Sequence, residues 1–368
     1  MLAADVADYI RFRAVCSAWR RCTADPRAAH HGALDRRFHP RHWIMLRDRA
    51  DADRPLRRRF LNISTGECIR MEELSELHGR TVLAPTPEGL LVLVDDEGII
   101  SLLNPLTGVR TNLPSVKTML SSCTTVSRLV VRPYRQNLAL HGAGITEDST
   151  VVLNFHRPRI LAIASPGDEN WTKVSYEHGR NFVQAIWPFS GRVYCATNMS
   201  LMVVEVSANQ PPRLAEVAKI KPSVLQTCIC MDTRTDTVHL VDNGGELTVV
   251  QRMSRRCNDD VHGKYTMMYY VYRVDLDAGK MTHVVGLGGR TVFIGKHRAL
   301  SVPAGLFPSL AGDSLYLGYD CEEKYSREVI DAYHLLDGKK LPNFTAGNRP
   351  VHPCGIVYYL SVCAFAPR

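Results

Sequence analysis

The sequence predicts a mainly β protein, built as a propeller and preceded by a short helical segment. After Phe60, short apolar runs alternate with turn residues as far as the C-terminus, and no stretch keeps a helical period for three turns. Related turn phrases recur at residues 62–67, 104–108 and 275–280. No linker divides this body into two sandwiches, and the recurring turns favour a propeller over a large barrel. Repeats of roughly 40 to 50 residues would give about six to seven blades.

The composition is that of an ordinary globular protein. The chain has 368 residues, of which 45% are hydrophobic and 22% are charged. These values exclude the collagen-like, fully disordered and multi-span membrane classes. The net charge of +8 is uneven, because residues 1–60 hold 14 of the 45 basic side chains and 7 of the 37 acidic ones. The rest of the chain is therefore close to neutral.

The arginine-rich start raises nucleic-acid binding as one interpretation. Such binding needs a basic surface interleaved with aromatic rings, or a recognised module. Arg41, Trp43 and the three arginines at 57–59 give only a hint of that pattern. We therefore expect no nucleic-acid partner.

Residues 8–22 are predicted to form the helix in front of the β body. Asp8 is the expected N-cap, and Asp25-Pro26 ends the helix, because proline lacks an amide hydrogen and restricts the residue before it. Four apolar residues fall at i, i+3, i+4 and i+7, which places them on one face. These are Phe12, Val15, Cys16 and Trp19, with Arg11, Arg13, Arg20 and Arg21 on the other side.

The chain after this helix is predicted to be a basic linker and then a series of hairpins. Residues 28–59 are rich in arginine and histidine, although 42–46 could form a first strand. The clearest hairpin joins 238–241 to 246–250 through Asn243-Gly244, since both residues tolerate positive φ. Further hairpins are predicted between 90–94 and 99–103, 269–276 and 281–285, 186–189 and 193–196, and around Asp337-Gly338.

No catalytic motif is present in the sequence. There is no phosphate-binding loop, His-Glu-x-x-His motif, Gly-x-Ser-x-Gly elbow or kinase signature. Residues 286–289 resemble the beginning of a dinucleotide-binding loop, but no βαβ unit surrounds them, so we interpret them as a turn between blades. Asp95, Asp96 and Glu97 could be paired carboxylates, yet a solvated hairpin tip explains them better. We expect neither an enzyme nor a cofactor.

The eleven cysteines indicate a reducing compartment. They are odd in number and lack a framework spacing, and no basic-then-apolar leader opens the sequence, so we expect a cytoplasmic or nuclear protein. Cys228 and Cys230, with the nearby His239, could be imagined as metal ligands. Structural zinc needs a second pair, which is lacking, so a buried strand is the preferred interpretation. The longest apolar run, residues 355–366, is shorter than the ~20 residues that cross a bilayer, and we expect no membrane partner.

Two parts of the sequence resemble a known plant family. Residues 10–20, which read Ile-Arg-Phe-Arg-Ala-Val-Cys-Ser-Ala-Trp-Arg, resemble the second half of an F-box. Residues 89–93, 103–108, 239–247 and 272–277 resemble the plant domain of unknown function that follows many F-boxes and is regarded as a β-propeller of kelch-like type. The resemblance implies a partial F-box over 1–27, truncated at its N-terminus, a basic linker over 28–59 and a propeller domain over 60–368.

The resemblance also implies a function. F-box proteins of this kind are non-catalytic adaptors of a cullin ubiquitin ligase: the F-box docks on a Skp-type protein and the propeller selects a protein substrate. Phe12, Val15, Cys16 and Trp19 would form the apolar face of the F-box helix, part of which would contact that partner. The alternative is a stand-alone protein-binding propeller, uncoupled from ubiquitin transfer, whose N-terminal helix covers a propeller edge.

Overall fold

The computed structural model of the protein is mainly β. The residues that it describes form six sheets and few helices, which confirms the predicted propeller and gives it six blades. None of the helices in these residues is long and apolar enough to cross a membrane. The described residues are 5–28, 34–46, 58–71, 74–120, 138–175, 182–207, 209–220, 233–256, 265–295, 299–307, 310–317 and 332–341.

The chain divides into two compact units. The first comprises residues 1–63, 67–175 and 190–193, and the second comprises 64–66, 176–189 and 194–368. The helices near the N-terminus and the first three sheets belong to the first unit, whereas most of the other three sheets belong to the second.

Two short helices replace the single helix predicted over residues 8–22. Helix α1 is Val6–Val15 and helix α2 is Ser17–Arg21. The chain is extended at Cys16 between them, with φ −156° and ψ 166°. Asp5 caps α1. Asp8 lies inside the first turn of α1, where the positive end of the helix dipole stabilises its negative charge. The predictions of one continuous helix and of an Asp8 cap are therefore wrong.

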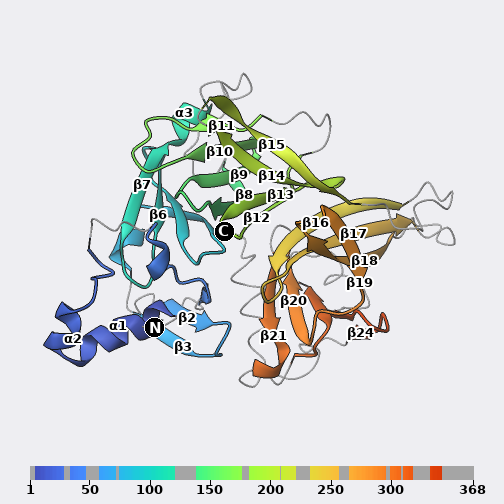
Figure 1. The fold of residues 1–368 in the computed structure, drawn as a ribbon, viewed down its shortest axis with the longest axis horizontal. Coiled ribbons are helices and arrows are strands. Elements are labelled where there is room, and N and C mark those ends of the chain that lie inside the picture. The colour runs from blue at the N-terminus through green and yellow to red at the C-terminus, as the bar shows by residue number, and fades with distance from the viewer. Residues whose placement is uncertain are drawn as a thin grey trace. The chain divides into compact units, whose positions relative to one another are not determined.

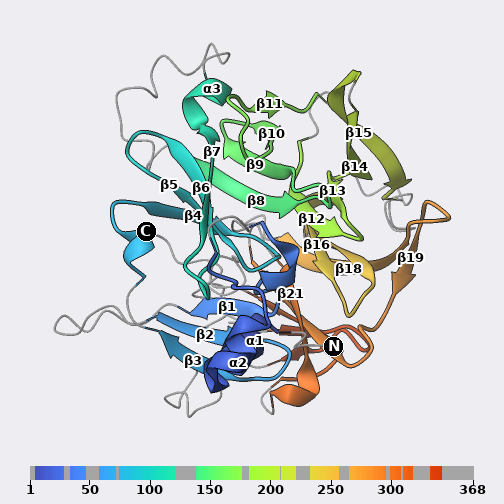
Figure 2. The ribbon, with the colours of Figure 1, turned by 60° about the vertical axis from the view of Figure 1, so that its left-hand side comes forward.

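The first sheet has three antiparallel strands, and α1 packs against it. The strand predicted at 42–46 is confirmed as β1, the first strand of this sheet. Val6 and Ala7 of α1 share one buried cluster with Phe38, Trp43 and Phe60. Figures 1 and 2 both place α1 beside the sheet. The elements here are the 3-10 helix η2 (Arg36–Phe38) and strands β1 (Trp43–Leu46), β2 (Arg58–Asn62) and β3 (Cys68–Met71).

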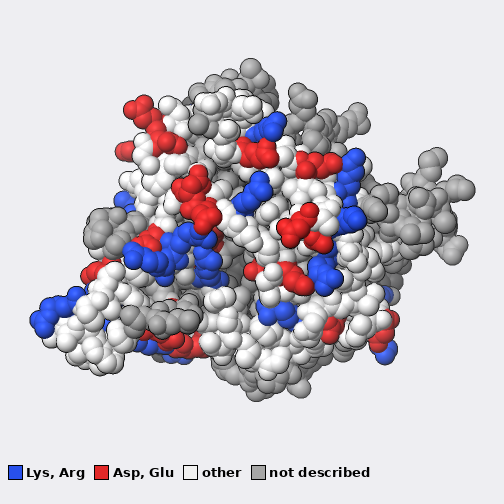
Figure 3. Space-filling view, in the orientation of Figure 1, with Lys and Arg blue, Asp and Glu red and all other residues white. Residues whose placement is uncertain are grey.

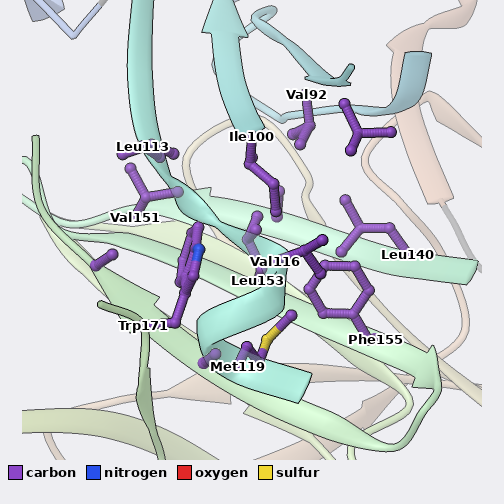
Figure 4. Close-up of a cluster of buried hydrophobic side chains, with 14 of the residues drawn as sticks. Val92, Ile100, Leu113, Val116, Met119, Leu140, Val151, Leu153, Phe155 and Trp171 are labelled. Atoms are coloured by element: carbon purple, nitrogen blue, oxygen red, sulfur yellow. The ribbon is translucent and has the colours of Figure 1, made fainter. Parts of the chain in front are cut away.

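The second and third sheets each have four antiparallel strands and share a core. The hairpin predicted between 90–94 and 99–103 is confirmed as β5–β6. The side chain of Trp171 lies in the shared core with Met119 and Phe155 (Figure 4), and its Nε1 donates to the carbonyl of Pro114 at 2.8 Å. The elements are η3 (Ser75–Leu77), β4 (Thr81–Pro85), β5 (Leu91–Val94), β6 (Ile99–Leu103), β7 (Arg110–Ser115), α3 (Val116–Leu120), β8 (Ala139–Ile145), β9 (Val151–Arg157), β10 (Ile160–Ala164) and β11 (Thr172–Lys173).

The remaining sheets follow the predicted hairpins closely. The strand pairs β12–β13, β16–β17, β18–β19 and β23–β24 are neighbours in their sheets, as predicted. The last sheet is mixed, because β20 and β22 are parallel. The elements are β12 (Ala185–Phe189), β13 (Arg192–Ala196), β14 (Ser200–Ser207), β15 (Gln210–Lys219), β16 (Thr233–Asp242), β17 (Leu247–Arg256), β18 (Tyr265–Asp275), β19 (Lys280–Val284), β20 (Arg290–Ile294), β21 (Ala299–Pro303), η6 (Ala304–Leu306), β22 (Ser314–Leu317), β23 (Ala332–His334) and β24 (Lys340–Leu341).

The turn between β16 and β17 uses its asparagine differently from the prediction. Gly244 and Gly245 take positive φ values of 74° and 94°, whereas Asn243 does not enter that region. The side chain of Asn243 instead joins two sheets: its Nδ2 donates to the carbonyl of Leu287 at 3.1 Å, and its Oδ1 accepts from the hydroxyl of Ser301 at 2.8 Å. The asparagine therefore holds neighbouring blades of the second unit together.

Candidate partner-binding surface

Asp5 anchors the start of α1 to the first sheet. Its Oδ1 accepts from the backbone N–H of Ala7 at 2.7 Å, as an N-cap does. Its Oδ2 accepts from the indole Nε1 of Trp43 at 2.8 Å and from the amide Nδ2 of Asn62 at 2.9 Å. One carboxylate thus joins the helix to β1 and β2.

Arg13 is buried, although the sequence placed it on the solvent side of the helix. Its side chain turns toward the end of α2, where Nη1 lies within hydrogen-bond distance of the carbonyls of Arg20, Thr23 and Ala24 and of the Thr23 hydroxyl. Its Nη2 forms an ion pair with Asp25 at 3.5 Å. The Arg20 carbonyl is at the C-terminus of α2 and lacks a partner within the helix, whereas those of Thr23 and Ala24 follow the C-cap, Cys22. The guanidinium therefore joins the end of α2 and the chain after it to α1. Arg13 is therefore the polar anchor of α2.

The predicted face of Phe12, Val15, Cys16 and Trp19 is on the outside of the helix pair. Because the helix is broken at Cys16, the Phe12 and Trp19 rings stack, with centroids 4.2 Å apart and planes at 15°. Val15 is 64% exposed and Trp19 is 41% exposed. The thiol of Cys16 is also exposed and accepts from the backbone N–H of Trp19 at 3.4 Å. The structure thus brings Phe12, Cys16 and Trp19 together, and Val15 is exposed on the same helix as Phe12; we call these four residues the outer face.

Arginines border the outer face. Arg11 forms an ion pair with Asp8 at 2.9 Å and another with Glu67, and the hydrogen bond to Glu67 raises the pKa of the guanidinium above its ordinary value. Arg20 and Arg21 are exposed, and no carboxylate of the described residues lies within ion-pair distance of either. Basic side chains project at the left of Figure 3, where Figure 1 places α2, beside an uncharged surface. The outer face is therefore apolar with a positive border.

Glu88 is a buried carboxyl that the sequence did not single out. It lies in the turn before β5, and its Oε1 accepts from the backbone N–H of Ile145 in β8 at 3.0 Å. Its Oε2 is buried and has no hydrogen-bond partner in the described part of the chain. Burial raises the pKa of this carboxyl, and the bond from Ile145 opposes that effect. Glu88 joins the second and third sheets of the first unit.

The two loops whose sequences could suggest a chemical role, residues 95–97 and 286–289, are turns, as predicted. Asp95 closes the β5–β6 hairpin, because its Oδ1 accepts from the backbone N–H groups of Glu97 at 3.1 Å and Ile99 at 2.8 Å. The loop at 286–289 is held by Asp313, whose Oδ1 accepts from the N–H groups of Leu287 and Gly289. Both loops use a carboxylate to satisfy turn N–H groups.

The other candidates from the sequence do not form a site in the described residues. Cys228 and Cys230 lie outside them, and His239 is buried with its Nε2 3.1 Å from the Thr237 hydroxyl. No group of three or more metal-ligating side chains occurs among the residues that the structure describes. Trp43, considered above as a base-stacking ring, is buried and bonded to Asp5.

Six sheets in this order, with α1 packed on the first of them, define a β-propeller with an N-terminal helical extension. The KIB1-4 beta-propeller family model matches residues 60–335, which is most of the chain. The chain therefore belongs to the KIB1-4 beta-propeller family.

One curated relative and two solved structures give further comparisons. The chain is 26% identical over 192 residues to "Putative F-box protein At3g25750" of Arabidopsis thaliana, and the match covers 52% of this chain and 49% of the relative. The chain thus spans about half the length of the curated relative.

The solved structures are more distant. YCF48 from Cyanidioschyzon merolae is 13% identical, with 62% of this chain and 66% of that chain covered and a TM-score of 0.32. Virginiamycin B lyase from Staphylococcus aureus is 8% identical, with 62% and 76% covered and a TM-score of 0.30. Both TM-scores are so low that neither likeness bears on function.

Proposed function

We propose that this protein is a non-catalytic adaptor that recruits a protein substrate to a Skp-cullin-F-box ubiquitin ligase. In this role residues 1–27 act as the F-box segment, residues 28–59 connect it to the rest of the propeller and supply β1 of the first sheet, and residues 60–368 select the substrate. Phe12, Val15, Cys16 and Trp19 contact the Skp-type protein. The protein works in the cytoplasm or the nucleus, without a nucleic-acid or membrane partner.

The exposed outer face carries this proposal. Large apolar side chains that are exposed together on one surface typically mark a place where another protein binds. Here Val15 and Trp19 are exposed and Trp19 stacks on Phe12, within the segment that resembles an F-box. Membership of a propeller family and the F-box name of the Arabidopsis relative support the same role.

A second candidate function is a stand-alone protein-binding propeller that is uncoupled from ubiquitin transfer. The packing of α1 favours it, because Val6 and Ala7 are buried with Trp43 and Phe60 of the first sheet. A helix that covers a sheet in this way has a structural role whether or not a ligase is present. The two candidates differ in whether the outer face binds a Skp-type protein.

A binding measurement with the full chain separates the two functions. Purified plant Skp-type proteins are titrated with the wild type, with Val15→Asp and with the matched control Val206→Asp. Val15 and Val206 are 64% and 50% exposed, so both substitutions place a carboxylate on the surface, but only Val15 belongs to the outer face. We expect binding by the wild type and by Val206→Asp, and a loss of about 10-fold or more for Val15→Asp, because a charge would be buried at the centre of the interface.

The opposite results are equally informative. A wild-type chain that binds none of the Skp-type proteins would overturn the adaptor function and favour the stand-alone propeller. Equal losses for the two valine variants would show that the outer face is not the docking surface.

A further inference from the structure

We infer that Arg13 is a positioning residue that holds α2 against α1 and thereby presents the outer face, ready-made, to an acidic protein partner. This inference rests on the proposed function, since that partner is the Skp-type protein. It assigns a binding role to a side chain that does not itself lie on the outer face.

Apart from the stack of Trp19 on Phe12, helix α2 has little apolar contact to keep it in place. It has five residues, and none of them is buried. A helix of this length does not form by itself in water, because starting a helix costs more than one turn of hydrogen bonds returns. The geometry of α2 must therefore come from contacts with the rest of the helix pair.

Arg13 supplies the strongest of these contacts. Its Nη1 lies 3.0 Å from the carbonyl of Arg20, 2.9 Å from that of Ala24 and 2.8 Å from the Thr23 hydroxyl, so its two hydrogens are shared among these acceptors. In return the Nε of Arg20 donates to the carbonyl of Arg13 at 3.4 Å. Arg13 itself is only 9% exposed, and these bonds are partly buried. Charge-assisted bonds of this kind are among the stronger polar contacts in proteins.

The position of Trp19 follows from this anchor. Phe12 lies on α1 and Trp19 on α2, so their stack at 4.2 Å exists only while α2 is folded back at Cys16. Without Arg13, the free chain would spend only a fraction of its time with the outer face assembled. The apparent dissociation constant rises in proportion as that fraction falls.

The charges at the border indicate the chemistry of the partner. Arg20 and Arg21 are exposed and have no carboxylate within ion-pair distance among the described residues, and α2 has no acidic residue in its first turn. A partner that covers the outer face and offers carboxylates at its border would pair both arginines. The outer face therefore fits a protein with an apolar groove and an acidic border.

Hydrogen exchange and binding together test the role of Arg13. The full chain is prepared as wild type, as Arg13→Gln and as the matched control Arg110→Gln, which removes an exposed arginine from β7. Exchange is followed in peptides that cover 16–25, where the backbone N–H groups of Arg20 and Cys22 bond to the carbonyls of Cys16 and Ala18. Binding to a purified Skp-type protein is measured at low and high salt.

We expect Arg13→Gln to exchange about 10-fold faster than the wild type over 16–25, with no change in the blades, and to bind about 10-fold more weakly. Arg110→Gln should match the wild type in both measurements. Binding by the wild type should also weaken as salt is added, because carboxylates of the partner face Arg20 and Arg21. Arg13→Lys, which keeps the charge but not the planar fork, should give intermediate values and replaces Arg13→Gln if that variant does not fold.

Unchanged exchange over 16–25 in Arg13→Gln would overturn the inference, as would wild-type affinity for the Skp-type protein. Binding that does not respond to salt would contradict the acidic border. A wild type that binds no Skp-type protein would overturn the proposed function and the docking role with it, and the exchange data would still show whether Arg13 holds α2.

Discussion

The blades of the first unit and the helix pair are stabilised in different ways. In the second and third sheets, apolar side chains such as Leu102, Leu153 and Phe155 are fully buried in one core. Helix α1 shares a smaller core with the first sheet, and α2 has no buried residue at all. Apolar burial thus decreases from the blades through α1 to α2, and polar contacts contribute a correspondingly larger part of the stabilisation.

Because the two regions are held differently, the stability of the fold and the proposed binding should depend on different residues. Apolar burial holds the blades and α1, so substitutions there should unfold the protein. The outer face is held by the Arg13 anchor and one ring stack, and its exposed side chains contribute little to the fold. Side chains of the outer face can therefore be changed without loss of the propeller.

The largest expected effect comes from replacing one phenylalanine by alanine in each of the two regions. Phe155→Ala removes a ring from the shared core and should lower the free energy of unfolding by about 3–5 kcal/mol. Phe12→Ala removes a half-buried ring from the outer face and should cost less than about 1 kcal/mol. Urea denaturation of the full chain, followed by circular dichroism, measures both, and equal losses would refute the contrast between the two regions.

Asp5 joins the two regions, and its removal should have an intermediate effect. Asp5→Ala takes away the α1 cap and leaves the buried indole N–H of Trp43 without its acceptor. We expect the free energy of unfolding to fall by about 1–3 kcal/mol. Asp8→Ala is the matched control: Asp8 is exposed and pairs only at the surface with Arg11, so the same assay should show a change below about 1 kcal/mol. A reversed order would mean that Asp8 is the functional cap.

Glu88 is a buried carboxyl of the blades, and its contribution to stability should depend on pH. Burial raises the pKa of Glu88 in the folded chain above the ordinary 4.5. As the pH rises past the ordinary value, the unfolded chain loses the proton first, so the stability contributed by Glu88 is lost progressively toward its raised folded pKa.

Glu88→Gln tests this pH dependence, because glutamine stays uncharged and keeps an oxygen that can accept from Ile145 N–H. The free energy of unfolding of the variant, relative to the wild type, should increase as the pH rises above the ordinary value of 4.5. Denaturant titrations at several pH values provide the measurement. Parallel pH profiles for the two proteins would show that Glu88 is no more acidic when unfolded than when folded.

Local signals in the sequence predicted most of the blades. The β5–β6 and β16–β17 hairpins are each specified by two apolar runs and the turn between them, and a short window contains all of that information. The recurring turns predicted the repeat, but the choice of six blades over seven came from the structure and not from the sequence.

The helix pair was harder to predict because two apolar stripes overlap there. Val6, Tyr9, Ile10 and Arg13 have the same helical spacing as Phe12, Val15, Cys16 and Trp19, and a local pattern cannot say which stripe is buried. Trp43 and Phe60, far along the chain, select the first stripe. The first stripe was visible in the sequence, and it would have placed Arg13 on the inner side.

The anchors of the helix pair depend on contacts between residues distant in the sequence. Asp5 bonds to side chains 38 and 57 residues away, and either aspartate could serve as the cap by residue type alone. Arg13 finds its acceptors only because the chain turns back after Cys16. Glu88 similarly bonds to a strand 57 residues away. None of these partners can be identified from local spacing.

The smallest expected effect on stability is also the one that most sharpens the comparison. Val15→Asp should change the free energy of unfolding by no more than about 0.5 kcal/mol, because Val15 is largely exposed and loses little burial. The same variant is expected to lose binding to a Skp-type protein, so one substitution would separate the two properties. Differential scanning calorimetry beside Val206→Asp measures the first property. A clear drop in the melting temperature of Val15→Asp alone would show that the outer face supports the fold, and any binding loss would then reflect unfolding of the helix pair.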